Sequence, residues 1–210
     1  MQLVIGNKNY SSWSLRPWLG LKMAGIAFEE ILIPLYQEGS KAEMLKYSPT
    51  GRVPALLDGE LAVWDSLAIA EYIAEKFPDR QLWPQDAAAR AVARSVCAEM
   101  HSGFQALRTL CSMDIRARRQ VGLTPEVAAD IERIVAIWTD CRNRFAGGAP
   151  FLFGRFSWAD AFYAPVVLRF VTYGITVPDD AQRYMETVLA LPPVQEWIEA
   201  GRAEPWELHF

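Results

Sequence analysis

The sequence predicts an α/β sheet domain packed on an all-helical domain. Residues 1–78 alternate between strand-like and helix-like segments, whereas the segments after residue 86 are helix-like only. The stretch between them, residues 79–86, is polar and contains a proline, which is typical of a linker. We therefore divide the chain into an α/β domain (1–78), a linker (79–86) and an all-helical domain (87–210). Ligand sites favour such domain junctions, so the boundary between the halves is where we expect one.

The first half is predicted to run strand, helix, strand, hairpin, helix. A β-rich run ends at Gly6-Asn7, and the apolar spacing after it is that of an amphipathic helix. Asp58-Gly59 lies between two apolar runs and predicts a hairpin turn. The expected strands are residues 2–6, 28–35 and two within 53–64, the expected helices are 14–25 and 66–77, and residues 37–52 are expected to be irregular.

The second half is predicted to be helical. The expected helices are residues 87–113, 124–146, 157–173 and 177–191. Thr124 is expected to cap its helix, with Pro125 at the first helical position, where a missing N–H costs nothing. The last seven residues, EPWELHF, are expected either to fold over a ligand pocket or to form a tail.

Composition excludes several function classes. Hydrophobic residues make up 51% of the 210 residues, the net charge is −4, and no basic tract of five or more occurs, which argues against nucleic acid as the main partner. Three widely spaced cysteines without a CxxC pattern predict free thiols in a reducing compartment and no metal site. With neither a signal-peptide pattern nor an apolar run of 18 residues, we expect a cytoplasmic protein without a membrane span.

The stretch NYSSWSLRPWL (9–19) contains three serines before and within the first expected helix. Pro17 lacks an N–H and fits the first helical turn, so Ser14 is expected to be the N-cap, which puts Pro17 at the third helical position. Ser11 and Ser12 then precede a helix N-terminus, where backbone N–H groups favour an anion. Their hydroxyls are able to donate to a thiolate, a carboxylate or a phosphate, although turn formation alone also explains them.

Two further stretches carry polar or special residues next to a strand. Val53-Pro54 begins a strand, where a cis bond would turn the Val53 N–H and C=O outward. Asp65-Ser66 ends a strand and opens a helix, with Ser66 expected as the N-cap and Asp65 favourable to the helix dipole. An additional role for this pair is to hold the amine and the carboxylate of a zwitterionic ligand.

Taken together, these stretches resemble the cytosolic glutathione transferases over essentially the whole chain. The matching motifs occur in the family's order: YSSWSLRPWLGLKMAGI, SPTGRVPALLDG, VWDSLAIAEYIAEKFP and FSWADAFYAP. The resemblance implies a thioredoxin-like N-terminal domain that binds glutathione as co-substrate and a helical C-terminal domain that shapes the electrophile pocket. It also implies a homodimer, a role in detoxification and no metal.

The resemblance assigns site residues by position in this sequence. Pro54 would follow a cis bond, and the Val53 backbone would pair with the cysteinyl unit of glutathione. Asp65 and Ser66 would hold the γ-glutamyl end. Arg52, with Lys41 as a helper, would reach the glycyl carboxylate. The Ser157-x-x-Asp160 motif resembles the family's buried capping box, which is a folding element.

The hydroxyl that activates the thiol is left open by the resemblance. The zeta-class pattern S-S-C-x-x-R puts Ser11 at the activating position, whereas alignment on the arginine puts Ser12 there, and Tyr10 is a rival. Trp13 stands where related enzymes carry a cysteine, which disfavours disulfide chemistry. The implied reaction is thiolate addition to an electrophile or a glutathione-dependent isomerisation, and the alternative is a non-catalytic glutathione-binding or regulatory protein.

The electrophile pocket is the least predictable part of the site. Met100, Phe104, Leu107 and Cys111 share one helical face, which predicts core packing. Arg108 is expected to be solvated, with an anion-binding role for an acidic substrate as the alternative. His101 is not expected to be catalytic.

Overall fold

The N-terminal half of the molecule is a thioredoxin-like four-stranded mixed sheet with helices on both faces. In this computed structural model, which describes residues 1–208, the strand order is β2-β1-β3-β4. β1 pairs parallel with β2 and antiparallel with β3, and β3 pairs antiparallel with β4 around the predicted Asp58-Gly59 turn. The strands are β1 (Gln2–Ile5), β2 (Glu29–Leu32), β3 (Ala55–Asp58) and β4 (Leu61–Trp64).

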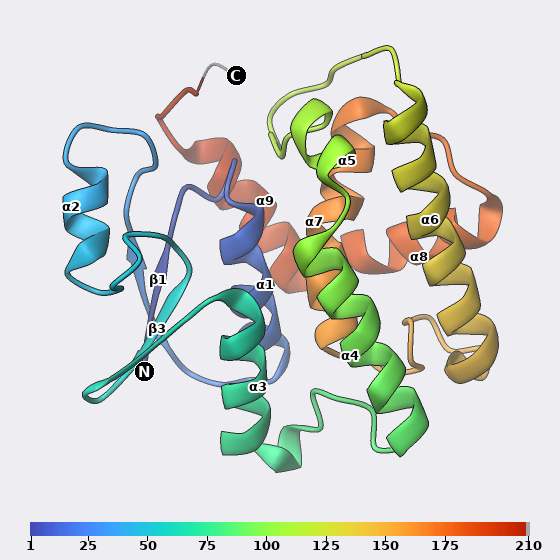
Figure 1. The fold of residues 1–210 in the computed structure, drawn as a ribbon, viewed down its shortest axis with the longest axis horizontal. Helices are drawn as coiled ribbons and strands as arrows, with labels where there is room; N and C mark the ends of the chain where they lie inside the picture. The colour runs from blue at the N-terminus through green and yellow to red at the C-terminus, as the bar shows by residue number, and fades with distance from the viewer. Residues whose placement is uncertain (209–210) are drawn as a thin grey trace.

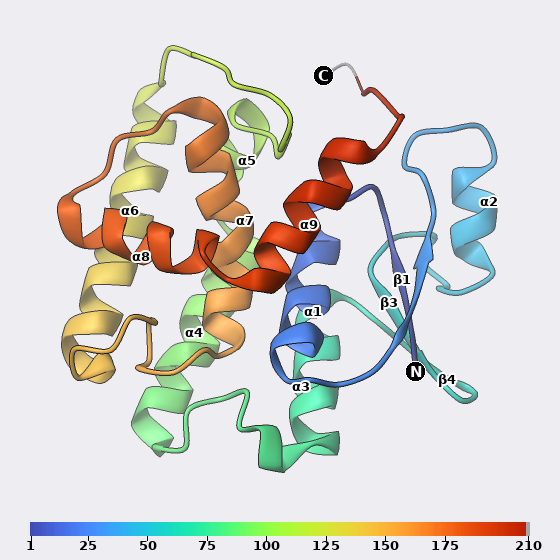
Figure 2. The same cartoon turned by 180° about the vertical axis from the view of Figure 1, so that it is seen from behind.

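Helices cover the sheet unequally. α1 (Ser12–Met23) and α3 (Ser66–Lys76) lie between the sheet and the helical half, whereas α2 (Ser40–Leu45) covers the other face (Figures 1 and 2). α2 falls in the stretch 37–52 that was expected to be irregular. It is a short helix with two buried residues, Ser40 and Met44, and therefore has little apolar periodicity to detect.

The C-terminal half is helical, as predicted. Its helices are α4 (Ala87–Ser102), α5 (Gln105–Leu110), α6 (Pro125–Cys141), α7 (Trp158–Tyr173), α8 (Asp179–Leu189) and α9 (Pro192–Ala203), with a 3₁₀ turn at Pro78–Arg80 before them and a π turn at Arg142–Ala146 after α6. The prediction of one continuous helix over 87–113 is wrong. The backbone breaks at Gly103 and at Phe104, whose φ is 57°, before α5 begins.

α7 is buried along almost its whole length and packs directly on α1. The approach is so close that a Cβ on Gly20 would lie 1.9 Å from the Trp158 ring. At the start of α7, Ser157 and Asp160 form the predicted capping box. The contact between α1 and α7 therefore joins the two halves of the molecule through one continuous core.

The C-terminal segment returns to the loop after β1. The carboxylate of Glu204 accepts hydrogen bonds from the backbone N–H groups of Lys8 (2.6 Å) and Asn9 (3.0 Å). Arg116 donates to the Glu204 and Trp206 carbonyls. Residues 204–208 of the final EPWELHF are therefore folded onto the protein, while His209 and Phe210 lie outside the described residues. None of the helices described is long and apolar enough to cross a membrane.

Candidate functional site

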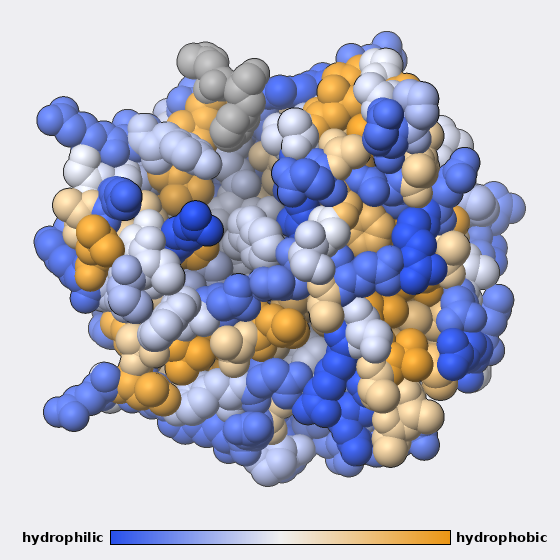
Figure 3. Space-filling view, viewed as in Figure 1, coloured by the Kyte–Doolittle hydropathy of each residue, from blue (hydrophilic) through white to orange (hydrophobic). Residues whose placement is uncertain are grey.

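A cavity of about 660 Å³ opens between the two halves of the molecule. Figure 3 shows the surface hollowed between the side that carries α2 and the side that carries α5. Its walls come from the loop after β1, from α2, from the loop before β3 and from the helical half. The residues that line it include Tyr10, Ser11, Ser12, Trp13, Lys41, Arg52, Val53, Arg108 and Arg169.

Ser11, not Ser14, is the N-cap of α1. Its Oγ accepts from the Ser14 N–H (3.4 Å) and donates to the Ser14 Oγ (2.7 Å). The Ser14 hydroxyl is drawn away from a capping role because it also accepts from the backbone N–H of Gly6 (3.1 Å). Pro17 is consequently the sixth residue of the helix, where it removes one backbone hydrogen bond. The expectation that Pro17 must lie in the first turn is therefore wrong.

Ser12 presents the more available hydroxyl. It is the first residue of α1, and its Oγ accepts a hydrogen bond from Nη2 of Arg169 (3.1 Å). Within residues 1–208 no protein acceptor takes the Ser12 hydroxyl proton, whereas the Ser11 proton goes to Ser14. A hydroxyl that accepts from a cation and keeps its own proton is well suited to donate to an anion in the cavity.

Tyr10 is turned toward the C-terminal segment. Its phenol oxygen accepts from Nη2 of Arg116 (2.9 Å) and from the backbone N–H of Leu208 (3.1 Å). The Tyr10 ring still lines the cavity. Its hydroxyl group is thus part of the contact that holds the chain's end beside the cavity.

The cavity wall opposite the start of α1 contains three residues that the sequence predicted to bind glutathione. They are Lys41, Arg52 and Val53. The Val53–Pro54 bond is cis, as the resemblance implies, and Pro54 is buried behind the wall. Lys41 and Arg52 are exposed, and their charges face a ligand that enters from solvent.

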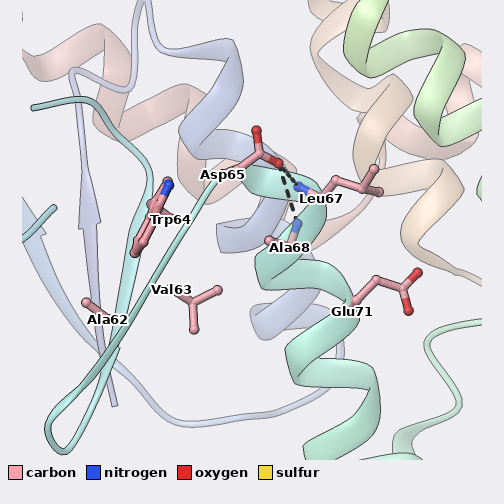
Figure 4. A pocket seen from close by; sticks show the side chains of 7 residues that line it. All are labelled: Ala62, Val63, Trp64, Asp65, Leu67, Ala68 and Glu71. Atoms are coloured by element: carbon pink, nitrogen blue, oxygen red, sulfur yellow. Dashed lines mark hydrogen bonds between the residues drawn. The ribbon is translucent and has the colours of Figure 1, made fainter. Parts of the chain in front are cut away.

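Asp65 and Ser66 lie outside the cavity lining. Asp65, with a φ of 77°, is the N-cap of α3 and accepts from the N–H groups of Leu67 (2.8 Å) and Ala68 (3.5 Å), so the expectation that Ser66 is the cap is wrong. The Asp65 side chain is short and already aligned with those N–H groups, whereas Ser66 is the first helical residue. Asp65 borders a second hollow of about 620 Å³ beside Trp64 (Figure 4).

A chain of contacts connects Ser66 to the cavity. Nη1 of Arg16 donates to the Ser66 Oγ (3.3 Å), and the same guanidinium lies 4.2 Å from the centre of the Trp13 ring. Trp13 lines the cavity on its other side. Nε2 of His101 lies 3.1 Å from Oδ2 of Asp65, and burial lowers the pKa of His101, so the neutral ring is favoured. Ser11 and Ser12 thus lie at the start of α1 and Asp65 and Ser66 at the start of α3, whereas Lys41, Arg52 and Val53 lie on the opposite wall of the cavity.

The cavity is cationic. Its lining contains Lys41, Arg52, Arg108 and Arg169 and, among the residues described, no acidic side chain. Burial, and next the positive charge of Arg108, lowers the pKa of Arg169 to about 10 and that of Arg16 to about 9. Within residues 1–208, Arg16, Arg108 and Arg169 form no ion pair with Asp or Glu. Such a concentration of unpaired positive charge favours an anionic ligand.

Arg169 is the site residue that the sequence analysis missed. It stands in α7, a helix that is otherwise apolar from Ala161 to Val171 apart from the Tyr163 hydroxyl. A lone arginine in so apolar a segment is the signal that would have identified it, because an unpaired buried charge is costly. The predicted core residues Met100, Phe104, Leu107 and Cys111 are all buried. Arg108, expected to be solvated, is half-buried and donates to the carbonyls of Gly103 and Met100.

No group of three or more His, Cys, Asp or Glu side chains able to hold a metal ion occurs in the described part of the chain. All three cysteines are free and buried. Burial raises the pKa of the Cys111 thiol, the cysteine nearest to Arg169 in the hydrogen-bond network.

Comparison with known proteins identifies both halves. The model for "Glutathione S-transferase, N-terminal domain" matches residues 10–76, and the model for "Glutathione S-transferase, C-terminal domain" matches residues 124–200. Glutathione S-transferase 1 of Dianthus caryophyllus is 35% identical over 115 residues, which cover 54% of this chain and 51% of that protein. The chain spans about half the length of the first curated relatives it matches.

Solved structures match over nearly the full length. A glutathione transferase homologue from Burkholderia, crystallised with bound glutathione, is 26% identical and has a TM-score of 0.72, covering 97% of this chain and 98% of that one. The maleylacetoacetate isomerase of Methylobacterium extorquens, with bound malonate and glutathione, is 25% identical and has a TM-score of 0.70, covering 99% and 100%.

Proposed function

Since the chain belongs to the glutathione S-transferase family, we propose that it binds glutathione in the cavity and activates the thiol as a thiolate. The thiolate then adds to an electrophilic small molecule, or adds and is later eliminated in an isomerisation. The observation that carries the proposal is the Ser12 hydroxyl, which lines the cavity at the N-terminus of α1 and keeps its proton available. The two related structures that contain bound glutathione and are described above support glutathione as the co-substrate.

Glutathione is expected to lie along the wall of the sheet domain. Its cysteinyl unit would pair with the Val53 backbone beside the cis bond to Pro54, and its glycyl carboxylate would meet Arg52 and Lys41. Its γ-glutamyl end would extend past Trp13 to Asp65 and Ser66. In this orientation Asp65 would face the γ-glutamyl ammonium, the Ser66 hydroxyl would face its carboxylate, and the two cations would face the glycyl carboxylate, while the sulfur would lie near the start of α1. In this proposal residues 1–78 form the glutathione-binding domain, residues 79–86 the linker and residues 87–210 the electrophile-binding domain.

The energy required for activation is within reach of these groups. A free thiol has a pKa of about 8.5, and lowering it by about two units requires roughly 2.7 kcal/mol in favour of the thiolate. One hydrogen bond to a charged group contributes about 1.5–3 kcal/mol, and a helix N-terminus adds about 0.3–1 kcal/mol. The serine donates a hydrogen bond and forms no covalent bond, while the thiol proton leaves to solvent and the sulfur lone pair attacks the electrophilic carbon.

The choice between Ser11 and Ser12 is tested by ultraviolet difference titration of the bound thiolate. We expect a thiol pKa well below 8.5 in the wild type. S12A should lose most of that lowering, whereas S11A should retain it and instead lose thermal stability, because Ser11 caps α1. Loss in S11A alone would assign the role to Ser11. Glutathione bound with an ordinary thiol pKa would favour a non-catalytic binding protein, and absence of binding would refute the proposal.

The electrophile is proposed to carry a negative charge. Arg108 stands on the wall opposite to Arg52, and its guanidinium lies 4.8 Å from the centre of the Trp13 ring. Glutathione already has partners for both its carboxylates in this scheme, so the cations of the helical half remain for the second substrate. The maleylacetoacetate isomerase structure was solved with both malonate, a dianion, and glutathione bound, which supports an anionic second substrate.

We also propose a homodimer formed across the second hollow. Trp64 of β4 is 45% exposed and borders this apolar hollow (Figure 4), and Leu61, which precedes the lining residue Ala62 in the same strand, is 47% exposed. Sedimentation of W64E should show a shift toward monomer, whereas L123E, which alters an equally exposed leucine outside the hollow, should not. An unchanged W64E would refute this interface. The three free thiols fit a reducing cytoplasm, where conjugation would remove reactive electrophiles as a detoxification step.

A further inference from the structure

We propose that Arg169 is a positioning residue that orients and polarises the Ser12 hydroxyl for thiol activation. The proposal rests on the proposed function. Arg169 belongs to the helical half and Ser12 to the sheet half, 157 residues apart in the sequence. Nη2 of Arg169 lies 3.1 Å from the Ser12 Oγ. The helical half would thus take part in activating glutathione as well as in shaping the electrophile pocket.

Arg169 is held rigidly for this task. Its side chain is 6% exposed, and Nη1 donates to the carbonyl of Cys111, which follows α5. With one end of the planar guanidinium fixed on that carbonyl, the other end is directed at Ser12. An arginine loses little further freedom when it makes a second bond from the same plane. Near the other end of the two helices, the close contact of Gly20 in α1 with Trp158 in α7 holds the same pair of helices together.

The hydrogen bond determines where the serine proton goes. Since a guanidinium has donors only, the Ser12 Oγ must be the acceptor. The hydroxyl proton must then point elsewhere, and the described protein groups offer it no acceptor. Ser12 lines the cavity, so the proton is directed toward the space where the sulfur is expected. Ser11 differs in this respect, because its own proton is given to Ser14.

The charge of Arg169 is not neutralised by the protein. The ionisable groups that face it are Arg108 of α5, Arg16 of α1, Cys111 and, one turn along α7, Tyr173. None of them is an aspartate or a glutamate, and Arg169 forms no ion pair among the residues described. An opposite charge within about 4–6 Å lowers the pKa of an acid by roughly 1–3 units. The guanidinium is therefore placed to favour the thiolate, mostly by orienting and polarising the Ser12 hydroxyl and to a smaller extent by its own charge.

The test measures the pKa of enzyme-bound glutathione in R169K, R169Q and R169M by thiolate absorbance. We expect R169Q and R169M to raise it by roughly one unit or more, and R169K to raise it less, because lysine retains the charge. With chlorodinitrobenzene as the electrophile, kcat/KM near pH 6.5 should fall roughly tenfold for each unit and recover at high pH. KM for glutathione should change less than twofold, since Arg169 does not contact the proposed glutathione wall.

Two controls separate positioning from a structural role. R142M removes another partly buried arginine, which bonds Asp180 and lies outside the cavity lining, and should lower Tm without moving the thiol pKa. In an S12A background, R169Q should add little to the change in pKa, because most of the effect is transmitted by the serine. Should R169M and R169Q not fold, R169K combined with S12A gives the same comparison.

The outcomes are distinguishable from failure of the proposed function. A wild type without a lowered thiol pKa would refute the proposed activation itself. A lowered pKa in the wild type that persists in folded R169Q, or in R169K if only that variant folds, would overturn the role of Arg169 and leave the activity intact. Equal and additive shifts with and without Ser12 would also overturn it, because Arg169 would then act independently of the serine.

Discussion

α7 carries two buried charged side chains, Asp160 near its start and Arg169 in its second half, and their surroundings differ. Asp160 accepts four hydrogen bonds from its own half, namely from Leu152 N, Ser157 N, Ser157 Oγ and Tyr184 Oη. Arg169 instead sends one of its two bonds across to the other half, to a hydroxyl that lines the cavity. The comparison shows that hydrogen-bond partners distinguish two kinds of buried charge. A charge bonded only within its own half serves folding, whereas a charge bonded to a group that lines the cavity is available to the site.

The largest effect that would sharpen this comparison is the loss of Asp160. D160A leaves two backbone N–H groups and two hydroxyls in the core without their acceptor, and each such loss costs about 1–3 kcal/mol. We expect the free energy of unfolding in urea to fall by roughly 4 kcal/mol. D179A, which alters an exposed aspartate in the first turn of α8, should cost only about 0.5 kcal/mol. A D160A loss below about 1 kcal/mol would contradict a folding role.

The pH dependence of stability gives a second, slightly smaller effect. Burial raises the pKa of Asp160 from 3.8 to about 6, against the opposing hydrogen bonds. The folded state then binds the proton more tightly than the unfolded state, so this contribution is fully present below about pH 4 and is lost as the pH rises to about 6. The shift corresponds to about 3 kcal/mol at most. D160N cannot ionise. Its free energy of unfolding, measured by urea titration at each pH, should therefore lack the fall between about pH 4 and pH 6 that the wild type shows.

Much of the fold follows from local signals in the sequence. The Asp58-Gly59 turn, the Thr124-Pro125 helix start and the Ser157–Asp160 capping box each involve residues a few positions apart, and all are present. The Ser14 prediction failed because the backbone N–H that occupies this hydroxyl belongs to Gly6, which lies in another element. The break at Phe104 was missed because the apolar spacing continues through it.

The same limit applies to the candidate site. The loop serines, Val53-Pro54 and Asp65-Ser66 were predicted because they stand at the ends of strands and helices, where unpaired backbone groups signal a site. Arg169 has no such neighbour in the sequence. Its partner is 157 residues away, so only the packing of α7 on α1 brings the two together.

Removal of the Ser14 hydroxyl would test the comparison within α1 itself. Ser14 accepts from Gly6 N and Ser11 Oγ, both within the sheet half, and therefore belongs with Asp160 as a folding group. S14A should lower the free energy of unfolding by about 1–2 kcal/mol and leave the bound thiol pKa within a few tenths of a unit. A thiol pKa that rose as much in S14A as in S12A would show that the serines act as one unit and that Ser14 is not solely a folding group.

The smallest expected effect concerns Arg108, whose bonds to the carbonyls of Gly103 and Met100 give it a structural role while its guanidinium also lines the cavity. If Arg108 also binds the electrophile, a chloronitrobenzoate should react with a higher kcat/KM than the chloronitrobenzamide of the same substitution pattern. Both values are first corrected for the intrinsic rate of each compound with free glutathione. An exposed ion pair is worth up to about 1 kcal/mol, which is roughly a fivefold preference. R108K should keep most of that preference, because it keeps the charge, and R108M should abolish it. If R108M loses stability while the preference for the benzoate persists, Arg108 belongs with Asp160 as a folding group, and the selection of a charged electrophile passes to Arg169.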